Sequence, residues 1–143
     1  MSLPDPLEIL PAARHELDRA GQEFLADFFR AETDRHPDNL GALASLAEVL
    51  TQMGRLEEGL ATDQKLLRLA PDNPTVHYNL ACSLALLGHV DGALDALERA
   101  VELGYDDAEH LVRDDDLHPL RREPRFQRLV RRLEAARSDV SSR

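Results

Sequence analysis

The sequence predicts an all-α protein, an alpha-alpha superhelix (solenoid) of antiparallel helix pairs closed by a C-terminal capping helix. Three observations predict this fold class. The chain is 43% hydrophobic but only 4% aromatic and has no Trp, so its apolar residues are mainly Leu, Ala and Val. Taken together, this mixture favours helices over strands. It matches itself at a shift of 34 residues, a period typical of repeated two-helix units. Within each repeat, apolar residues recur every three or four positions.

The length limits how many domains the chain can form. At 143 residues it has the size of one domain, large enough for a continuous core and too small for two ordinary ones. We therefore expect a single repeat domain over residues 1–143.

Residues 7–36 are expected to form a partial, degenerate repeat. Four apolar residues upstream of Pro37 are expected to lie on its second helix: Phe24, Leu25, Phe28 and Phe29. Pro11 falls within the first helix and is expected to shorten or break it. We expect this segment to cap the array.

Two complete repeats are expected at residues 37–70 and 71–104. The shift of 34 aligns nine identical residues, where chance would give about two or three. The aligned identities are Pro37-Asp38-Asn39 with Pro71-Asp72-Asn73, Leu46-Ala47 with Leu80-Ala81, and Leu50, Gly54, Leu60 and Leu69 with Leu84, Gly88, Leu94 and Leu103.

Signals for the starts and ends of helices agree with this division. Asn73 is expected to cap a helix that has Pro74 at its first position, and Asp91 is expected to cap the next helix. Left-handed glycine commonly ends a helix, and three glycines stand at the expected ends: Gly54, Gly88 and Gly104.

Residues 105–137 are expected to diverge from the repeat. The period places Asp114 where the complete repeats have Leu46 and Leu80, and an unpaired carboxylate is costly to bury. We expect a short helix over 107–113, a turn at 114–116, a brief segment at 117–121 and a capping helix from Pro124. The apolar face of that helix comprises Phe126, Leu129, Val130 and Leu133. Residues 138–143 are polar, and we expect a disordered tail.

Residues 37–104 resemble the tetratricopeptide repeat (TPR) family. The resemblance rests on the 34-residue period, on Ala81 in the first helix, Gly88 at the turn, and Ala93 and Ala100 in the second helix. Gly59 departs from it, since the family prefers alanine there and glycine weakens a helix by about 1 kcal/mol. The terminal segment resembles that of small bacterial members. The whole chain would thus hold about three TPR-like units.

This resemblance implies a concave groove lined by the first helix of each repeat, which could hold an extended peptide or a helix of a partner protein. The expected ligand-binding residues are Glu48, Thr51, Gln52, Thr75, Tyr78, Asn79, Cys82 and Arg113. Glu48 would repel a carboxylate and favours a basic or neutral peptide. Alternatively, Tyr78 merely packs and Asn79 merely satisfies backbone groups.

The charge distribution argues against nucleic acid and membranes as partners. The net charge is −10, and residues 1–104 hold 18 acidic against 8 basic side chains, which favours basic partners. Residues 119–137 carry seven Arg, but Phe126 is the only aromatic residue there that could stack on a base. We expect these arginines to be solubilising or paired with the acidic body.

No catalytic, metal or cofactor motif is recognisable. The histidines show no metal-ligand spacing, and the acidic run 114–116 lacks the pattern of a calcium loop, so we expect a capping or solvated turn there. Cys82 is the only cysteine and has no evident base. Nothing at the N-terminus is typical of a targeting segment, which makes the cytoplasm the expected location.

The sequence therefore predicts a non-catalytic protein–protein interaction module, a scaffold or adaptor, with no cofactor. The alternative is an accessory or regulatory domain that acts by self-association or by docking on an enzyme. The sequence leaves the oligomeric state open.

Overall fold

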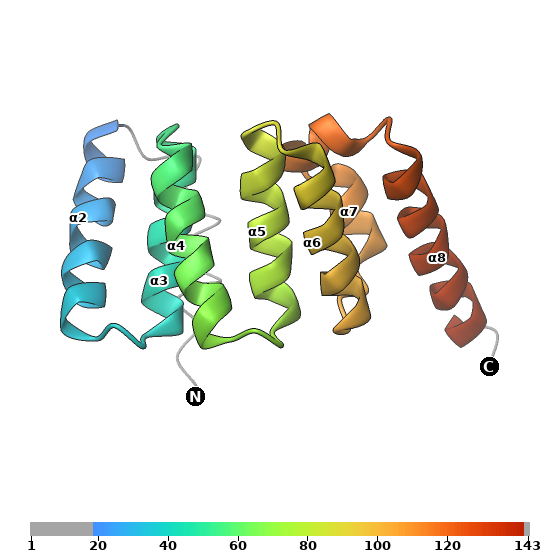
Figure 1. The fold of residues 1–143 in the computed structure, drawn as a ribbon, viewed down its shortest axis with the longest axis horizontal. Helices are drawn as coiled ribbons and strands as arrows, with labels where there is room; N and C mark the ends of the chain where they lie inside the picture. Colours follow the sequence, from blue (N-terminus) through green and yellow to red (C-terminus); the bar gives the residue numbers. More distant parts are fainter. Residues whose placement is uncertain (1–18, 142–143) are drawn as a thin grey trace. The chain divides into compact units, whose positions relative to one another are not determined.

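The computed structural model describes residues 19–141 (Figure 1), and in these residues the protein is helical without strands. The described part divides into two compact units, with the boundary between Pro71 and Asp72. We call them unit 1 and unit 2. Unit 1 contains α2 (Arg19–Arg35), α3 (Leu40–Gln52) and α4 (Leu56–Leu69). Unit 2 contains α5 (Pro74–Leu86), α6 (Val90–Glu102), α7 (Ala108–Arg113), the 3-10 helix η1 (Asp115–Leu120) and α8 (Pro124–Ser141). The single domain expected from the length stays a prediction.

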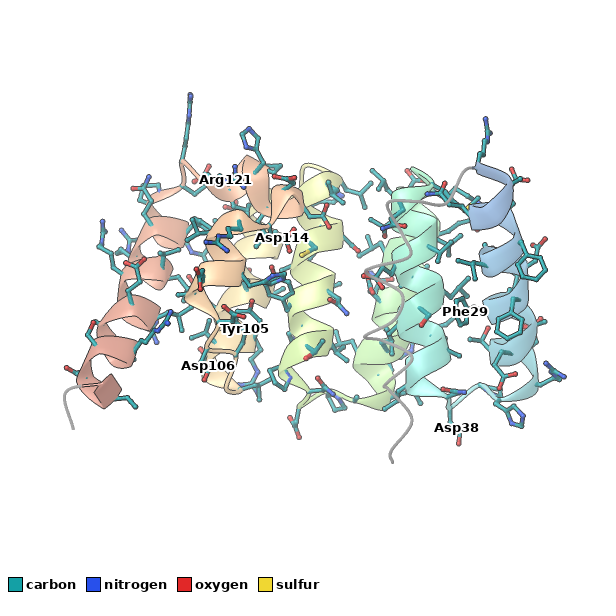
Figure 2. The ribbon with its side chains drawn as sticks, turned by 180° about the vertical axis from the view of Figure 1, so that it is seen from behind. Phe29, Asp38, Tyr105, Asp106, Asp114 and Arg121 are labelled. Carbon is teal, nitrogen blue, oxygen red and sulfur yellow. The ribbon has the colours of Figure 1, made fainter. Side chains whose placement is uncertain are left out.

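In unit 1, α3 packs against both α2 and α4. The side chain of Asn39 caps α3 by accepting a hydrogen bond from the backbone N–H of Ala42 at 3.1 Å. Phe29 points from α2 toward α3 (Figure 2), where it packs on the buried side chains of Ala26, Leu46, Val49 and Leu50. The expected first helix of the partial repeat, with Pro11, lies outside the described residues.

The structure explains why position 59 is a glycine, where the TPR family prefers alanine. A Cβ at this position would lie 2.6 Å from Oγ1 of Thr51 and 3.3 Å from the carbonyl oxygen of Ala47. Both atoms belong to α3, so the missing side chain lets α4 approach α3 closely.

In unit 2, α5 and α6 form a closely packed pair. The expected cap at Asn73 is confirmed, because its side chain accepts hydrogen bonds from the N–H groups of Thr75 and Val76 at 2.9 and 3.3 Å. The expected glycine stops are also confirmed, since φ is +78° at Gly54, +83° at Gly88 and +116° at Gly104.

The expected cap at Asp91 is wrong. His89 occupies the cap position without a side-chain hydrogen bond, and Asp91 lies within the first turn of α6. The preceding helix is closed by hydrogen bonds from the N–H groups of Gly88 and His89 to Ala85 and Leu84, so the next helix begins without a further linking residue. Asp91 still complements the positive end of the helix dipole.

The C-terminal part of unit 2 contains two short helices, α7 and η1, before the closing helix. Asp107 caps α7 through the N–H of His110, and Asp114 caps η1 through the N–H of Asp116. η1 packs on α5 and buries Leu117 and Leu120 completely.

The closing helix α8 begins at Pro124 as expected and buries Phe126, Leu129 and Leu133. It continues through residues 138–141, where we expected a disordered tail, while residues 142–143 lie outside the described part. Among the helices of the described chain, none is long and apolar enough to cross a membrane.

Candidate functional site

The expected ligand-binding residues fall on both units. Glu48, Thr51 and Gln52 lie on α3 in unit 1, whereas Thr75, Tyr78, Asn79 and Cys82 lie on α5 in unit 2 and Arg113 ends α7. We describe each unit separately.

In unit 1, the three candidates of α3 have different surroundings. The hydroxyl of Thr51 donates to the carbonyl of Ala47 at 2.8 Å and faces α4 at Gly59. Gln52 is exposed and lines a surface depression together with residues of α2 such as Gln22. Glu48 is half-buried. The helix therefore points Thr51 toward its own partner helix and leaves Gln52 accessible beside α2.

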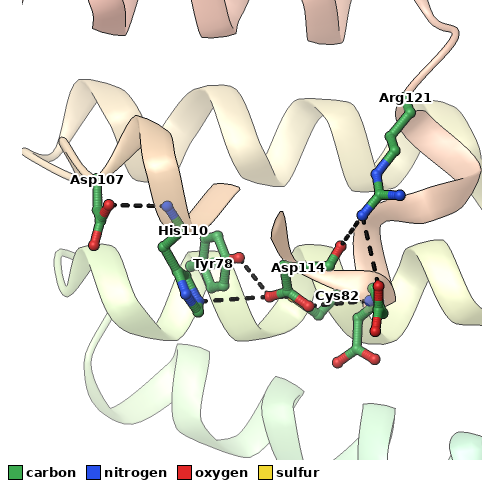
Figure 3. Close-up of polar contacts among 8 residues, drawn as sticks. Tyr78, Cys82, Asp107, His110, Asp114 and Arg121 are labelled. Atoms are coloured by element: carbon green, nitrogen blue, oxygen red, sulfur yellow. Dashed lines mark hydrogen bonds and ion pairs between the residues drawn. The ribbon is translucent and has the colours of Figure 1, made fainter. Parts of the chain in front are cut away.

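In unit 2, Tyr78 and Cys82 are buried, with 5% and 8% of their surface exposed. Both side chains converge on the carboxylate of Asp114 (Figure 3). The Tyr78 hydroxyl donates to Oδ2 at 2.5 Å, and the Cys82 thiol donates to the same oxygen at 3.7 Å. These two groups thus form a hydrogen-bonded core with Asp114 and do not present their polar atoms to a ligand.

Asp114 can occupy this place because its carboxylate is fully engaged. Its other oxygen, Oδ1, accepts the N–H of Asp116 at 3.0 Å, and Nε2 of His110 lies 3.6 Å from Oδ2. The guanidinium of Arg121 also donates to the Asp114 carbonyl at 3.4 Å. The sequence indicated that the chain must diverge at Asp114, but it did not indicate that Tyr78 and Cys82 would be its partners.

Burial keeps both donors neutral. Desolvation is the largest cause that raises the pKa of Tyr78, followed by the nearby Cys82 and Asp114 groups. Desolvation likewise raises the pKa of the Cys82 thiol, and the charges of Asp114 and Asp116 add to the effect. A protonated phenol and a protonated thiol are the forms that can donate to a carboxylate, so the pKa shifts and the hydrogen bonds agree.

Two further side chains, which the sequence did not single out, complete this core. The Tyr105 ring stacks on Tyr78 with centroids 4.6 Å apart and planes inclined by 13°. The His110 ring lies on Tyr78 at 5.5 Å. Both lie just beyond the second complete repeat, where the divergent segment folds back on α5, and no spacing in the sequence marks them as partners of Tyr78.

The same cluster contains possible metal ligands. Cys82, Asp114 and Asp116 place one ligand atom each within 4.8 Å of one another. A metal would require the Cys82 thiolate, whereas burial raises the pKa of this thiol. Asp114 already accepts hydrogen bonds on both oxygens. We therefore interpret the cluster as a structural hydrogen-bond network.

The remaining candidates of unit 2 stay accessible. Thr75 is exposed and Asn79 is half-buried one turn further along α5. Neither side chain makes a hydrogen bond within the part of the chain that the structure describes. Arg113 is exposed and pairs with Glu109 at 2.9 Å. Thr75 and Asn79 thus form a polar stripe on α5 beside the buried Tyr78 core.

Paired helices that repeat along the sequence define the described part of the chain as a helical-repeat protein. Residues 74–107 match the tetratricopeptide repeat profile, and this match begins where α5 begins. Residues 74–107 are therefore similar to one tetratricopeptide repeat.

Three relatives have about one third of aligned residues identical. A chloroplastic protein of Arabidopsis thaliana is 33% identical over 57% of this chain and 25% of its own length. Protein CTR9 homolog, from the same plant, is 33% identical over 70% of this chain and 9% of its own length. The peroxisomal targeting signal receptor of Komagataella phaffii is 34% identical over 55% of this chain and 14% of its own length.

The chain therefore spans a quarter or less of the length of each of these relatives. All three come from eukaryotes, so the bacterial type expected from the terminal segment stays a prediction.

Proposed function

We propose that the protein is a non-catalytic scaffold or adaptor that binds an extended segment or a helix of a partner protein along the polar stripe of α5. The observation that carries this proposal is the pair Thr75 and Asn79, whose side chains are accessible and have no hydrogen-bond partner within the described residues. The expected cytoplasmic location belongs to the same proposal.

The chemistry of the stripe suits a peptide backbone. An Asn amide offers both donors and an acceptor, and a Thr hydroxyl offers one of each. An extended peptide presents alternating N–H and C=O groups that such side chains can satisfy. Asn79 therefore contributes affinity without demanding one particular side chain from the partner.

The buried core next to the stripe holds the binding residues in place. Tyr78 precedes Asn79 directly in α5 and is fixed by Asp114 and by the Tyr105 ring. A rigid helix lowers the entropy lost on binding, because fewer torsions need to be ordered. We accordingly assign Tyr78 and Cys82 to the support of the surface and Thr75 and Asn79 to contact with the partner.

One relative lends support by its name. The peroxisomal targeting signal receptor is described as a receptor for a targeting signal, which is consistent with recognition of a segment of another protein.

The test compares proteins captured from a lysate by wild type and by a Thr75→Ala/Asn79→Ala variant. The matched control is Gln64→Ala/Lys65→Ala, which removes two exposed polar side chains from α4. We expect the same captured proteins with wild type and control, and their loss with the stripe variant. Equal capture by all three would contradict the proposal. Tyr78 is left unchanged, because its loss would alter folding as well as binding.

A further inference from the structure

The helix α2 carries apolar side chains beyond the face that packs on α3. Leu25, Ala26 and Phe29 face α3, while Phe24 and Phe28 extend the apolar surface outward and expose 70% and 52% of their surface. The Phe28 ring lies edge-on to Phe29, with centroids 5.3 Å apart. Aromatic side chains one turn apart share a helix face. Exposed apolar patches on soluble proteins commonly mark interaction sites, so this outer face of α2 is suited to a contact.

Acidic side chains border the exposed phenylalanines. Asp27 and Asp34 are exposed on α2 and lie two turns apart on the same side of the helix. Neither makes an ion pair among residues 19–141. The outer face of α2 therefore combines two aromatic rings with unpaired negative charge.

The helix α8 has the opposite character. Its buried side is formed by Phe126, Leu129 and Leu133, and its exposed side carries Arg128, Arg131 and Arg132. Like charges one turn apart on a helix repel each other. These three arginines form no ion pair in the described chain.

A neighbouring arginine shows the contrast. Arg125 donates to both carboxylate oxygens of Glu98 at 3.0 Å and to Asp95 at 2.6 Å. Arg125 thus fulfils the expected pairing with the acidic body, while the Arg128–Arg132 face needs an anionic surface from elsewhere.

We propose that the outer face of α2 in one copy of this chain docks on the outer face of α8 in another. A guanidinium stacks favourably over a phenyl ring, and Arg–carboxylate hydrogen bonds would engage Asp27 and Asp34. Charge selects this pairing over symmetric ones. Two α2 faces would bring Asp27 and Asp34 of both copies together, and two α8 faces would oppose arginine to arginine.

Such a contact is head-to-tail. Each copy that uses its α2 face keeps its α8 face free for the next copy, so association continues beyond the dimer unless a ring closes. A single pair of helices is small against the roughly 1,600 Å² of a standard interface. The association is therefore reversible and depends on concentration.

The experiment measures the mean mass of the full chain by sedimentation or light scattering across a wide concentration range. Variant A, Phe24→Ser/Phe28→Ser, removes the α2 face, and variant B, Arg131→Glu/Arg132→Glu, removes the α8 face. All four side chains are exposed, so folding is retained, which circular dichroism verifies. Control substitutions are Leu69→Ser/Val112→Ser, at exposed apolar sites elsewhere, and Arg122→Glu/Arg137→Glu, with the same charge change outside the Arg128–Arg132 face.

We expect wild type and both controls to rise in mean mass with concentration, and variants A and B to remain monomeric alone. An equimolar mixture of A and B retains one intact α8 face and one intact α2 face, so it should reach about twice the monomer mass and stop there. Wild type that stays monomeric would overturn the proposal. So would a mixture that stays monomeric, because an intact α2 face and an intact α8 face would then meet without binding. Association of variant A or of variant B alone would also overturn it, because it would indicate a symmetric contact.

Discussion

The hydrogen bond between Tyr78 and Asp114 gives the sharpest stability prediction. The phenol donates to the carboxylate at 2.5 Å in a site where Tyr78 is 5% exposed. Hydrogen bonds to charged groups contribute about 1.5–3 kcal/mol. Tyr78→Phe removes only the hydroxyl and keeps the ring stacked on Tyr105. We therefore expect the free energy of unfolding of unit 2 to fall by about 1.5–3 kcal/mol.

Asp114→Ala should cost more. It removes the acceptor of both Tyr78 and Cys82 and the cap of η1. A lost cap costs about 1 kcal/mol, and a buried hydroxyl without a partner costs about 1–3 kcal/mol. The combined loss should be about 2–4 kcal/mol. Combined with Tyr78→Phe, the substitution should cost less than the sum, because both remove the same bond.

Urea denaturation followed by circular dichroism measures both effects, and Tyr105→Phe supplies a matched control. The Tyr105 hydroxyl is buried and has no hydrogen-bond partner within the described residues. Its removal should leave stability unchanged or slightly raised, since no bond is lost. If Tyr78→Phe proves no more costly than Tyr105→Phe, the role assigned to the Asp114 network is refuted.

Further predictions concern three other sites: Gly59, Asn73 and Cys82. Gly59→Ala should lower the free energy of unfolding by about 1 kcal/mol, because its Cβ meets the Thr51 hydroxyl. With Thr51→Ala as well, urea denaturation should show part of the loss recovered, because the contact with the hydroxyl is removed while the one with the Ala47 carbonyl remains. Asn73→Ala should cost about 1 kcal/mol in thermal unfolding, since two N–H groups lose their acceptor. Burial raises the pKa of Cys82, so the native thiol should react slowly with iodoacetamide at a pH near 8.5, where a free thiol reacts readily. The unfolded thiol ionises near that pH while the folded one stays neutral, so stability should fall as the pH rises above about 8.5, and Cys82→Ala should remove that fall.

The helices and their turns could be predicted because local signals suffice for them. Asn73 followed by proline marks a helix start, and glycines such as Gly88 mark helix ends, whatever the rest of the chain does. The prediction that Asp91 caps α6 was wrong because Asp is favourable both at the cap and in the first turn of a helix, so the residue type alone does not separate the two positions. Only the hydrogen bonds closing α5 show that α6 begins earlier.

The candidate site was less accessible to sequence reasoning, since it depends on contacts between distant residues. Tyr78 meets Asp114 across 36 positions, and nothing in the repeat period pairs them. Gly59 looked like a weakness because its neighbour Thr51 lies on another helix. Exposure on α5 could be derived from helical spacing, but burial of Tyr78 and Cys82 required knowing where the divergent segment folds back.

The stripe of Thr75 and Asn79 on α5 is the proposed contact with a partner protein. Photocrosslinking in living cells tests it directly, with p-benzoylphenylalanine in place of Asn79 and, in a matched strain, in place of the exposed Gln64 on α4. We expect a discrete covalent adduct to a second protein from position 79 and none from position 64. An adduct from position 64 alone, or from neither position, would contradict the claim.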